Sequence, residues 1–541
     1  MALLVDPPPR DNAGERSSAE VPPESPNETD AGPGSPVITE PFLEPDSVEP
    51  APGEPEPAEA ELTEPKLAEP PLTGGRVEIL MGRLIRVLSH SRLARPLPAV
   101  LLSAVGLAGV AFNGLCATAD PRASAASPPV VLPLTSAAQD LGAPHLSFLA
   151  ANLIMYPSIT LCCLGLAMML WANSRGWSPN PRKVFWTAAG AVAVLVNITP
   201  VGSGDVASYA AYGRIAALGY NPYTFLPSQL PGPNNPYTML VSPMWRGTPS
   251  VYGPVATWEH LLAASIGGAK PWLTIWVLMI MAGAAFLATG YVLLRTAENP
   301  VRAVLLWVAN PLLILELVMG GHLNGLLALA AIAATVVSRR CARPWHDLVV
   351  GLLVGIAGGI KIDAAFVALA IAIPLIHDRA WGRLVRTGVV AGLTTFCLYY
   401  FSYGLTALKP LRGASTLVIS PTPWRLLQVT VQHYYGNNAE HAVTSTFGFI
   451  WPPLTLLLAW YLYNRLSPDV PTVVAASCAL TFAWMVVNPW QLPWYSTIAW
   501  VTLALLPRNS LTRWLTIATG ALALAHFNGW SSTNAPVGPT P

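Results

Sequence analysis

The sequence predicts an all-α polytopic membrane protein with about 13 transmembrane helices. Of the 541 residues, 52% are hydrophobic and only 11% are charged, a balance typical of integral membrane proteins. Apolar runs recur along the chain, and most are long enough for the roughly 20-residue helix that crosses a hydrocarbon core about 30 Å thick. Arg and Lys gather in alternate connections between these runs. Because cytoplasmic connections carry the excess of positive charge, this alternation indicates a chain that crosses a membrane repeatedly.

Each expected helix begins near the start of an apolar run. The starts lie near Leu97, Leu146, Val184, Pro271, Arg302, Leu323, Leu348, Asp363, Leu384, Phe449, Pro471, Pro493 and Trp514. Four arginines between residues 83 and 95 precede the first run, which predicts a cytoplasmic N-terminus. Every later cytoplasmic connection then contains a cation. These cations are Arg175, Arg182, Lys183, Arg295, Arg302, Arg339, Arg340, Arg343, Arg379, Arg383, Arg386, Arg465, Arg508 and Arg513.

The composition divides the chain into three regions. Residues 1–75 are rich in Pro, Glu and Ala and have too little apolar surface to fold, so we expect a disordered cytoplasmic tail. Both a regulatory partner and no specific role remain open for this tail. Residues 76–530 form the expected transmembrane domain, and residues 531–541 a short external tail. The net charge of +1 argues against a nucleic-acid partner, and the six cysteines lack the Cys/His spacing of a metal site, so no metal and no other cofactor is expected.

Several polar segments are expected on one face of the membrane. Counting Val251–Gly267 as a span would place the Arg339 cluster outside, so we interpret this segment as an amphipathic helix at the outer surface. Five polar segments then face outward. They are the loop with Asp205, the turns Gly320–Asn324 and Gly359–Asp363, the long loop from Gly404 to Gly448, and Asn488–Tyr495. Their convergence predicts an active site rather than a permeation path.

Asp205 is the candidate catalytic residue. It follows Gly202-Ser203-Gly204 and begins a run with helical spacing. One interpretation is a helix N-cap, and the other is a general base that takes a proton from a sugar hydroxyl at the outer end of a span. One carboxylate can do both. Of the four tyrosines that follow, we expect Tyr209 in the acceptor groove and most of the others to be interfacial anchors.

Two outward-facing cations are candidates for binding a phosphate. Arg246 lies in a Gly- and Pro-rich segment, and its planar guanidinium suits a phosphate, with a lipid headgroup as the alternative. Lys361 and Asp363 interrupt an apolar stretch. The alternative here is a plain turn whose two charges neutralise each other at a wet interface. The scarcity of cations on this face favours phosphate binding by Lys361.

The remaining candidates are substrate-binding residues in two other outward-facing segments. His322 and Asn324 lie at the mouth of a span that carries Glu316 within its apolar run. A carboxylate at that depth is costly, so Glu316 is either a site residue or a buried structural group, such as a partner of His322. In the segment "NPWQLPWY", Gln491, Trp494 and Tyr495 either contact a lipid or sugar or belong to the interfacial aromatic belt.

Six motifs in order carry a resemblance to a known family. They are "GDVASY", "GYNPY", "MWRGTPSVYGP", "WVANPLLILELVMGGH", "GIKIDAAF" and "NPWQLPWY". The chain resembles the actinobacterial polyprenyl-phosphomannose-dependent α-1,6-mannosyltransferases of the glycosyltransferase C superfamily, from about Leu97 to Asn528. The family commonly has an acid after the His-Asn pair, whereas this chain reads "GGHLNG", and Ala207 replaces the usual aromatic residue.

The resemblance implies a glycosyltransferase C fold, and it implies that Asp205 is the catalytic base. The implied reaction moves mannose from a β-linked polyprenyl phosphate to a hydroxyl of a lipid-anchored mannan, with inversion to an α-1,6 linkage on the outer face of the plasma membrane. Donor, acceptor and membrane lipids are the implied partners. Another polyprenyl-linked sugar, such as arabinose or glucose, is the alternative donor, and a transporter or lipid flippase is the alternative class of protein.

Overall fold

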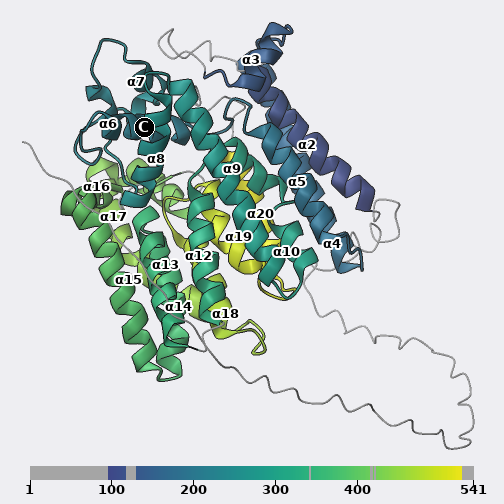
Figure 1. Cartoon of the computed structure of the whole chain (residues 1–541), viewed down its shortest axis with the longest axis vertical. Coiled ribbons are helices and arrows are strands. Elements are labelled where there is room, and N and C mark those ends of the chain that lie inside the picture. Colours follow the sequence, from purple (N-terminus) through teal and green to yellow (C-terminus); the bar gives the residue numbers. More distant parts are fainter. Residues whose placement is uncertain (1–95, 117–129, 340–342, 415–417, 420–421, 527–541) are drawn as a thin grey trace, which may run out of the picture. The chain divides into compact units, whose positions relative to one another are not determined.

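The computed structural model describes residues 96–116, 130–339, 343–414, 418–419 and 422–526, and these ranges contain helices and no strand. Figure 1 shows their arrangement. The expected tails, residues 1–75 and 531–541, lie outside the described residues. The all-α prediction is therefore confirmed for the described part of the chain.

The helices follow one another with short connections. In the first half they are α2 (Pro96–Cys116), α3 (Pro133–Asp140), α4 (Phe148–Ser174), α5 (Pro181–Leu195), α6 (Asp205–Ala217), α7 (Pro236–Leu240), α8 (Pro254–Gly267), α9 (Pro271–Thr296), α10 (Pro300–Leu306), α11 (Pro311–Leu313) and the π-helix η4 (Ile314–Met319). In the second half they are α12 (Asn324–Arg339), α13 (Pro344–Ile360), α14 (Ala364–His377), α15 (Trp381–Ser402), α16 (Lys409–Ala414), α17 (Pro423–Tyr463), α18 (Thr472–Val487), η6 (Pro493–Ser496), α19 (Thr497–Leu503) and α20 (Leu511–His526).

Several of these helices are long and apolar enough to cross a membrane. Five qualify singly: α2, α4, α9, α15 and the second part of α17. The segment from α10 to η4 forms a sixth if its two parts, bent by 43°, are one broken span. Four more apolar helices, α12, α13, α14 and α18, are shorter. Each expected start lies in or near a helix, but the expected count of 13 spans is not confirmed, because half of these helices are shorter than a single span requires.

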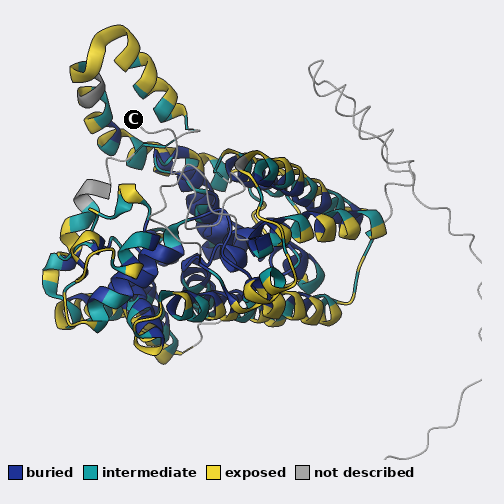
Figure 2. Ribbon diagram, turned by 90° about the horizontal axis from the view of Figure 1, so that it is seen from above, coloured by how far each residue is buried: buried dark blue, intermediate teal, exposed yellow. Residues whose placement is uncertain are grey.

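Small residues bring the helix pairs close together. A Cβ atom on Gly106 of α2 would lie 2.7 Å from the Ser158 carbonyl oxygen of α4. A Cβ atom on Gly351 of α13 would lie 2.7 Å from the Thr387 carbonyl oxygen of α15. Membrane helices associate through such close backbone contacts because lipid supplies no hydrophobic force between them. Figure 2 shows the buried residues gathered at the centre of the helix assembly, with exposed ones along the outer helices.

Two arginines expected at a cytoplasmic surface instead hold helices together. Arg383 and Arg386 of α15 bind the buried carboxylate of Asp347 on α13, with nitrogen–oxygen distances of 3.1 and 2.7 Å. A carboxylate inside an apolar assembly is tolerated only when it is paired. This ion pair fixes the end of α13 that lies far from Lys361.

Arg302 of α10 is also buried, at 3% exposure. Its guanidinium donates hydrogen bonds to the carbonyl oxygens of Leu503 and Leu506 at the end of α19, at 2.9 and 2.7 Å. It also donates to the Thr512 hydroxyl at 2.8 Å. A cation at a helix C-terminus satisfies carbonyl groups that have no partner within the helix.

Replacing Arg302 with Met is expected to destabilise the protein by about 3–5 kcal/mol, because buried carbonyl groups lose their partners. The apparent unfolding temperature in detergent measures this loss. Arg175→Met, at an exposed helix end, is the control. An unchanged midpoint for Arg302→Met would contradict the capping role.

Two connecting segments differ from, or refine, the expectations. The segment expected to be a long loop, from Gly404 to Gly448, is mostly helical, because α17 starts at Pro423 and continues through a kink at Gly436 (φ 79°). A proline fits the first turn of a helix, and its polar neighbours obscured this helix in the sequence. Val251–Gly267 does contain a helix, α8, which packs against α6 and α9 and leaves Trp258, Leu262 and Ile266 exposed.

Candidate active site

Asp205 is the first residue of α6, but its carboxylate does not cap the helix. The N-cap residue is Gly204, and no side chain caps this end. The N-cap interpretation of Asp205 is therefore wrong. The carboxylate accepts a hydrogen bond from the Tyr209 hydroxyl, one helical turn later, at 3.4 Å. A quarter of the Asp205 side chain remains exposed, so this oxygen pair can reach a ligand.

Three of the four tyrosines after Asp205 are buried, which makes the anchoring interpretation wrong for them. Tyr209, Tyr212 and Tyr223 are 1%, 4% and 2% exposed. The Tyr209 ring stacks on His260 of α8, with centroids 4.8 Å apart. Only Tyr220 is exposed, at 42%. The buried rings pack α6 against α8 instead of facing a membrane surface.

His322 links the Asp205 turn to the turn after η4. Its Nδ1 atom hydrogen-bonds the backbone carbonyl of Glu316, so the proton sits on Nδ1. Nε2 then accepts a hydrogen bond from the Ser203 hydroxyl at 3.0 Å. The Ser203 oxygen in turn accepts the backbone N–H of Asp205 at 3.2 Å. Burial lowers the pKa of His322 to about 3, so the 3.8 Å contact between Nε2 and Asp205 is not an ion pair.

Lys361 follows the last residue of α13 and is 7% exposed. Its ammonium group lies 3.0 Å from an Asp363 carboxylate oxygen and 3.5 Å from the centre of the Tyr495 ring. The pairing of the two charges was one of the expected alternatives, but the wet interface expected with it is wrong, because both side chains are buried. Lys361 is also close enough to lower the pKa of Asp205.

A glycine contact positions Lys361. The Gly253 N–H, just before α8, donates to the carbonyl oxygen of Ile360 at 2.9 Å. A Cβ atom on Gly253 would lie 2.2 Å from the carbonyl oxygen of Gly359. Only glycine allows this approach, which brings the "VYGP" segment against the turn that carries Lys361.

The segment around η6 closes the other side of this cluster. The Trp494 ring stacks on His322, with centroids 3.9 Å apart, and the Asn324 amide donates to the Trp494 carbonyl oxygen at 3.1 Å. Gln491 is 2% exposed. We use the term Asp205 cluster for Ser203, Asp205, Tyr209, His322, Lys361, Trp494 and Tyr495.

Two predicted site residues contact other parts of the protein. The guanidinium of Arg246 donates to the carbonyl oxygens of Val241 and Met239, at 2.9 and 3.1 Å, and so supports the end of α7. The Glu316 carboxyl is fully buried and lies beside the Ser496 hydroxyl and Cys163. His322 contacts the backbone of Glu316 and not its carboxyl. A π-helix at this position often accompanies a functional site, and here it directs the Glu316 side chain away from His322.

Sequence reasoning missed three residues that build the cluster: Ser203, Tyr252 and His260. Ser203 lies in the quoted motif next to Asp205, which was the available signal. The Tyr252 ring meets Tyr209 edge-on, with centroids 5.1 Å apart, and belongs to the "VYGP" motif. His260 had no signal beyond its place on the buried face of a short helix.

The electrostatics of the cluster favour a weakly acidic Asp205. Partial burial raises its pKa to about 6, and Lys361 and the Tyr209 hydrogen bond oppose this rise without cancelling it. A carboxylate with this pKa is ionised at neutral pH and is a stronger base than an ordinary aspartate. The same field leaves His322 neutral and Lys361 charged.

Membrane-length helices together with a base, a buried ammonium group and stacked aromatic rings define a class, the membrane-embedded enzymes. Comparison with known proteins gives the particular family. The family model described as "Alpha-(1->6)-mannopyranosyltransferase, N-terminal domain" matches residues 104–377. The chain belongs to this family. It is a glycosyltransferase that transfers mannose, which excludes the transporter and flippase alternatives and confirms the family resemblance seen in the motifs.

Three relatives carry the same activity in their names. A probable alpha-(1->6)-mannopyranosyltransferase of Mycolicibacterium smegmatis is 25% identical over 408 residues, which cover 64% of this chain and 71% of the relative. Alpha-(1->6)-mannopyranosyltransferase A of Corynebacterium glutamicum is 25% identical, over 56% of this chain and 67% of the relative. Alpha-(1->6)-mannopyranosyltransferase B of that organism is 31% identical, over 37% of this chain and 36% of the relative.

Proposed function

We propose that this enzyme transfers mannose from a polyprenyl-phosphate-mannose donor to a 6-hydroxyl of a lipid-anchored mannan, with an α-1,6 linkage as product. The observation that carries the proposal is the meeting of a partly exposed Asp205 with a buried Lys361 in one cluster. A base and a fixed cation are the two groups that direct displacement of a phosphate by a hydroxyl requires. The names of the relatives support mannose and the α-1,6 linkage.

Asp205 is the proposed base. As the acceptor oxygen attacks the anomeric carbon, its proton passes to the Asp205 carboxylate. The bond between the anomeric carbon and the phosphate oxygen breaks, and its electron pair leaves with the phosphate. One displacement inverts the carbon, so a β-linked donor gives an α product. Tyr209 and Ser203 hold the carboxylate and its backbone in place for this transfer.

Lys361 is the proposed phosphate-binding residue. Its partner Asp363 and the Tyr495 ring hold the ammonium group in a fixed position. A fixed charge stabilises the departing phosphate without reorganising during the reaction. Arg246 has a smaller part in this proposal, because its guanidinium already binds two backbone carbonyls. Gln491, Asn324 and Glu316 keep the surrounding turns in place.

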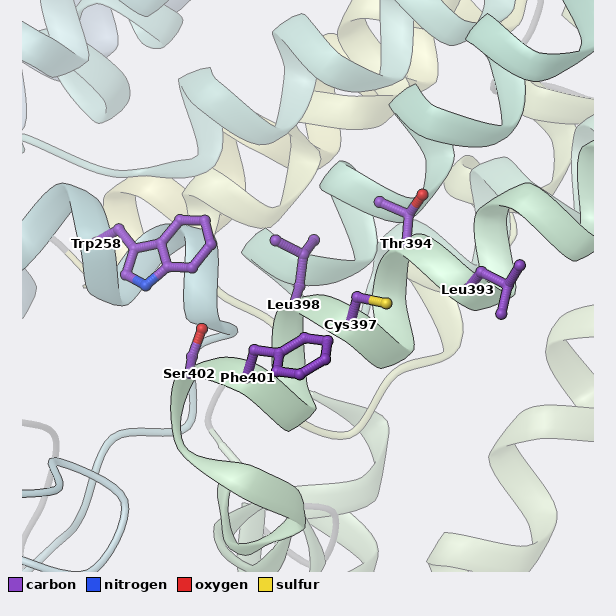
Figure 3. Close-up of a pocket in the computed structure, with 7 residues that line it drawn as sticks. All are labelled: Trp258, Leu393, Thr394, Cys397, Leu398, Phe401 and Ser402. Carbon is purple, nitrogen blue, oxygen red and sulfur yellow. The ribbon is translucent and has the colours of Figure 1, made fainter.

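An apolar groove of about 480 Å³ between α8 and α15 supports a lipid-linked donor. Figure 3 shows Trp258 of α8 facing the α15 side chains Cys397, Leu398 and Phe401 across it. The groove approaches the Lys361 turn, since Leu398 is in reach of Gly359 and the Tyr399 hydroxyl donates to the Gly358 carbonyl oxygen. We assign it to the first isoprene units of the donor, whose phosphate would lie at Lys361.

Alkylation of Cys397 with pyrenyl maleimide is expected to lower transfer from a long-chain donor about tenfold, the effect of losing roughly 60 Å² of apolar contact. Cys397 is exposed, whereas the other described cysteines are buried or half-buried. A donor with a two-isoprene chain should lose less. Cys397→Ser controls for reaction elsewhere. Equal inhibition of Cys397→Ser, or of both donors, would contradict the assignment.

The proposal places the site on the external face of the plasma membrane. The helices that lead away from the Asp205 cluster carry cations at their far ends: α12 ends at Arg339, and α15 begins with Arg383 and Arg386. Positive charge marks the cytoplasmic ends of membrane helices. The donor and the lipid-anchored acceptor would then both reach the cluster from the outer leaflet.

The pH dependence of transfer is expected to report the ionisation of Asp205. Only the ionised carboxylate accepts a proton, so kcat/KM should fall about tenfold for each pH unit below about 6. An ordinary aspartate would stay ionised to about pH 4. The measurement is kcat/KM between pH 4.5 and 8, with donor binding followed in parallel. A flat profile down to pH 5 would contradict the role of Asp205 as base.

The test of the whole proposal is a transfer assay on the purified enzyme in lipid. Radiolabelled polyprenyl-phosphate-mannose, polyprenyl-phosphate-arabinose and a nucleotide-linked mannose are offered with a short α-1,6-mannoside acceptor. We expect product from the first donor alone, with an α-1,6 linkage by methylation analysis. Product from the nucleotide donor would refute the lipid-linked donor, and product from the arabinose donor would refute the choice of sugar.

A further inference from the structure

A second pocket, of about 550 Å³, lies between the start of α5 and the end of α9, with Pro300 of α10 at its edge. Arg182 and Arg295 line it together with three aromatic residues. These are Phe185, Trp186 and Tyr291. The Phe185 ring lies 5.3 Å from that of Trp186 and 6.2 Å from that of Tyr291, centroid to centroid. The pocket therefore combines two cations with an aromatic wall.

The geometry of α5 and α9 holds the two cations at the pocket. Asn180 caps α5 by accepting the backbone N–H groups of Arg182 and Lys183, at 3.0 and 3.1 Å. The Arg295 guanidinium lies 5.8 Å from the centre of the Tyr291 ring and donates to its hydroxyl at 3.4 Å. Within the described ranges, neither arginine has a carboxylate within ion-pair distance.

This pocket is remote from the Asp205 cluster along the helices. Helix α5 starts at the pocket and leads to the Asp205 turn from its other end, ten residues after Leu195. Helix α9 ends at the pocket and starts beside α8, which packs on α6. A 26-residue helix is about 39 Å long, which spans a bilayer core. The pocket and the cluster therefore lie at opposite ends of these helices.

We propose that this pocket binds the headgroup of an anionic phospholipid, with the phosphate between Arg182 and Arg295. Basic pockets between membrane helices on the cytoplasmic side are suited to such headgroups. Guanidinium groups bind phosphate oxygens in pairs, which a lysine cannot do. The aromatic wall favours a lipid over free phosphate, because the exposed Trp186 and Tyr291, at 71% and 50%, offer an apolar surface to the glycerol and acyl region.

The test measures binding of phosphatidylglycerol to the full-length enzyme in detergent, by native mass spectrometry and by the rise in unfolding temperature. Phosphatidylcholine and free inorganic phosphate are the comparison ligands. We expect phosphatidylglycerol to bind at least tenfold more tightly than phosphatidylcholine. The double variant R182Q/R295Q should lose about tenfold in phosphatidylglycerol affinity, which corresponds to about 1.4 kcal/mol.

The chain offers a matched control for this variant. Arg465 lies 4.9 Å from the centre of the Tyr461 ring, the same four-residue spacing as Arg295 and Tyr291, but it does not line the pocket. R465Q should keep the wild-type affinity. Equal losses in R465Q and the double variant would show general surface electrostatics and overturn the site. Equal binding of free phosphate would overturn a lipid as ligand. None of these outcomes depends on the donor or on Asp205, so the inference stands apart from the proposed function.

Discussion

Replacement of Asp205 by Asn is expected to lower mannosyl transfer by about 10²–10⁴-fold, the range for loss of a general base. Asn keeps the shape of the side chain and still accepts the Tyr209 hydrogen bond. It cannot accept the acceptor proton. The loss should appear in kcat with little change in donor KM, because Asp205 acts on the acceptor hydroxyl. The measurement is transfer from the labelled donor by wild type and variant, purified in the same lipid.

The stability of Asp205→Asn separates a catalytic loss from misfolding. The pKa of Asp205 is raised from 3.8 to about 6 in the folded protein, so the folded state favours the protonated form. Ionisation therefore costs stability as the pH rises from about 4 to about 6, by at most about 3 kcal/mol. The neutral Asn avoids this cost. The variant should unfold at a higher temperature than wild type at pH 7.5 and at the same temperature near pH 4.

A matched change elsewhere completes this experiment. Asp378 is exposed and pairs only weakly with His377 at the surface. Asp378→Asn should transfer mannose at the wild-type rate. Wild-type transfer by Asp205→Asn would remove this residue as the base, while a lower unfolding temperature at pH 7.5 would show that the carboxylate supports the fold.

Replacement of Lys361 by Gln is expected to lower transfer by about 10²–10³-fold, because the departing phosphate loses its fixed positive charge. The single variant also leaves the buried Asp363 carboxylate without a partner, at a cost of about 3–5 kcal/mol. The double variant K361Q/D363N removes both charges. It should recover the wild-type unfolding temperature while transfer stays low.

The double variant thereby separates phosphate binding from charge neutralisation. If Lys361 only neutralised Asp363, K361Q/D363N would regain full transfer. Lys361→Arg keeps the charge and should retain more transfer than Lys361→Gln. Lys270 at the exposed start of α9 is the control, and Lys270→Gln should leave both transfer and stability unchanged.

Much of the helical framework was predictable because its signals are local. Apolar runs identified the helices that face lipid, and Pro at the first helical position marks many starts, including Pro96, Pro271 and Pro300. The kinked helix that starts at Pro423 was missed, because its polar composition between residues 430 and 442 is typical of a loop. Short apolar helices also blurred the number of spans, since shielding by neighbours replaces length.

The candidate site was only partly predictable. The polar turns with Asp205, His322 and Lys361 stood out because charge is rare in an apolar chain. Which side of each side chain faces a partner did not follow from the sequence. The tyrosines after Asp205 were expected at the membrane surface, yet three of them are buried against α8. An aromatic side chain suits both places, and only the position of α8 decides between them.

The sequence by itself determined the helical class of the protein, the approximate helix starts and the identity of its exceptional polar residues, because hydropathy, proline and charge act over a few neighbouring residues. Only the tertiary structure decided that Ser203 joins Asp205 to His322, that Lys361 lies on Tyr495, that Glu316 turns away from His322 and that Arg302 is buried. Each of these arrangements depends on how helices distant in the chain pack against one another. Packing fixes distances between residues that no local pattern relates.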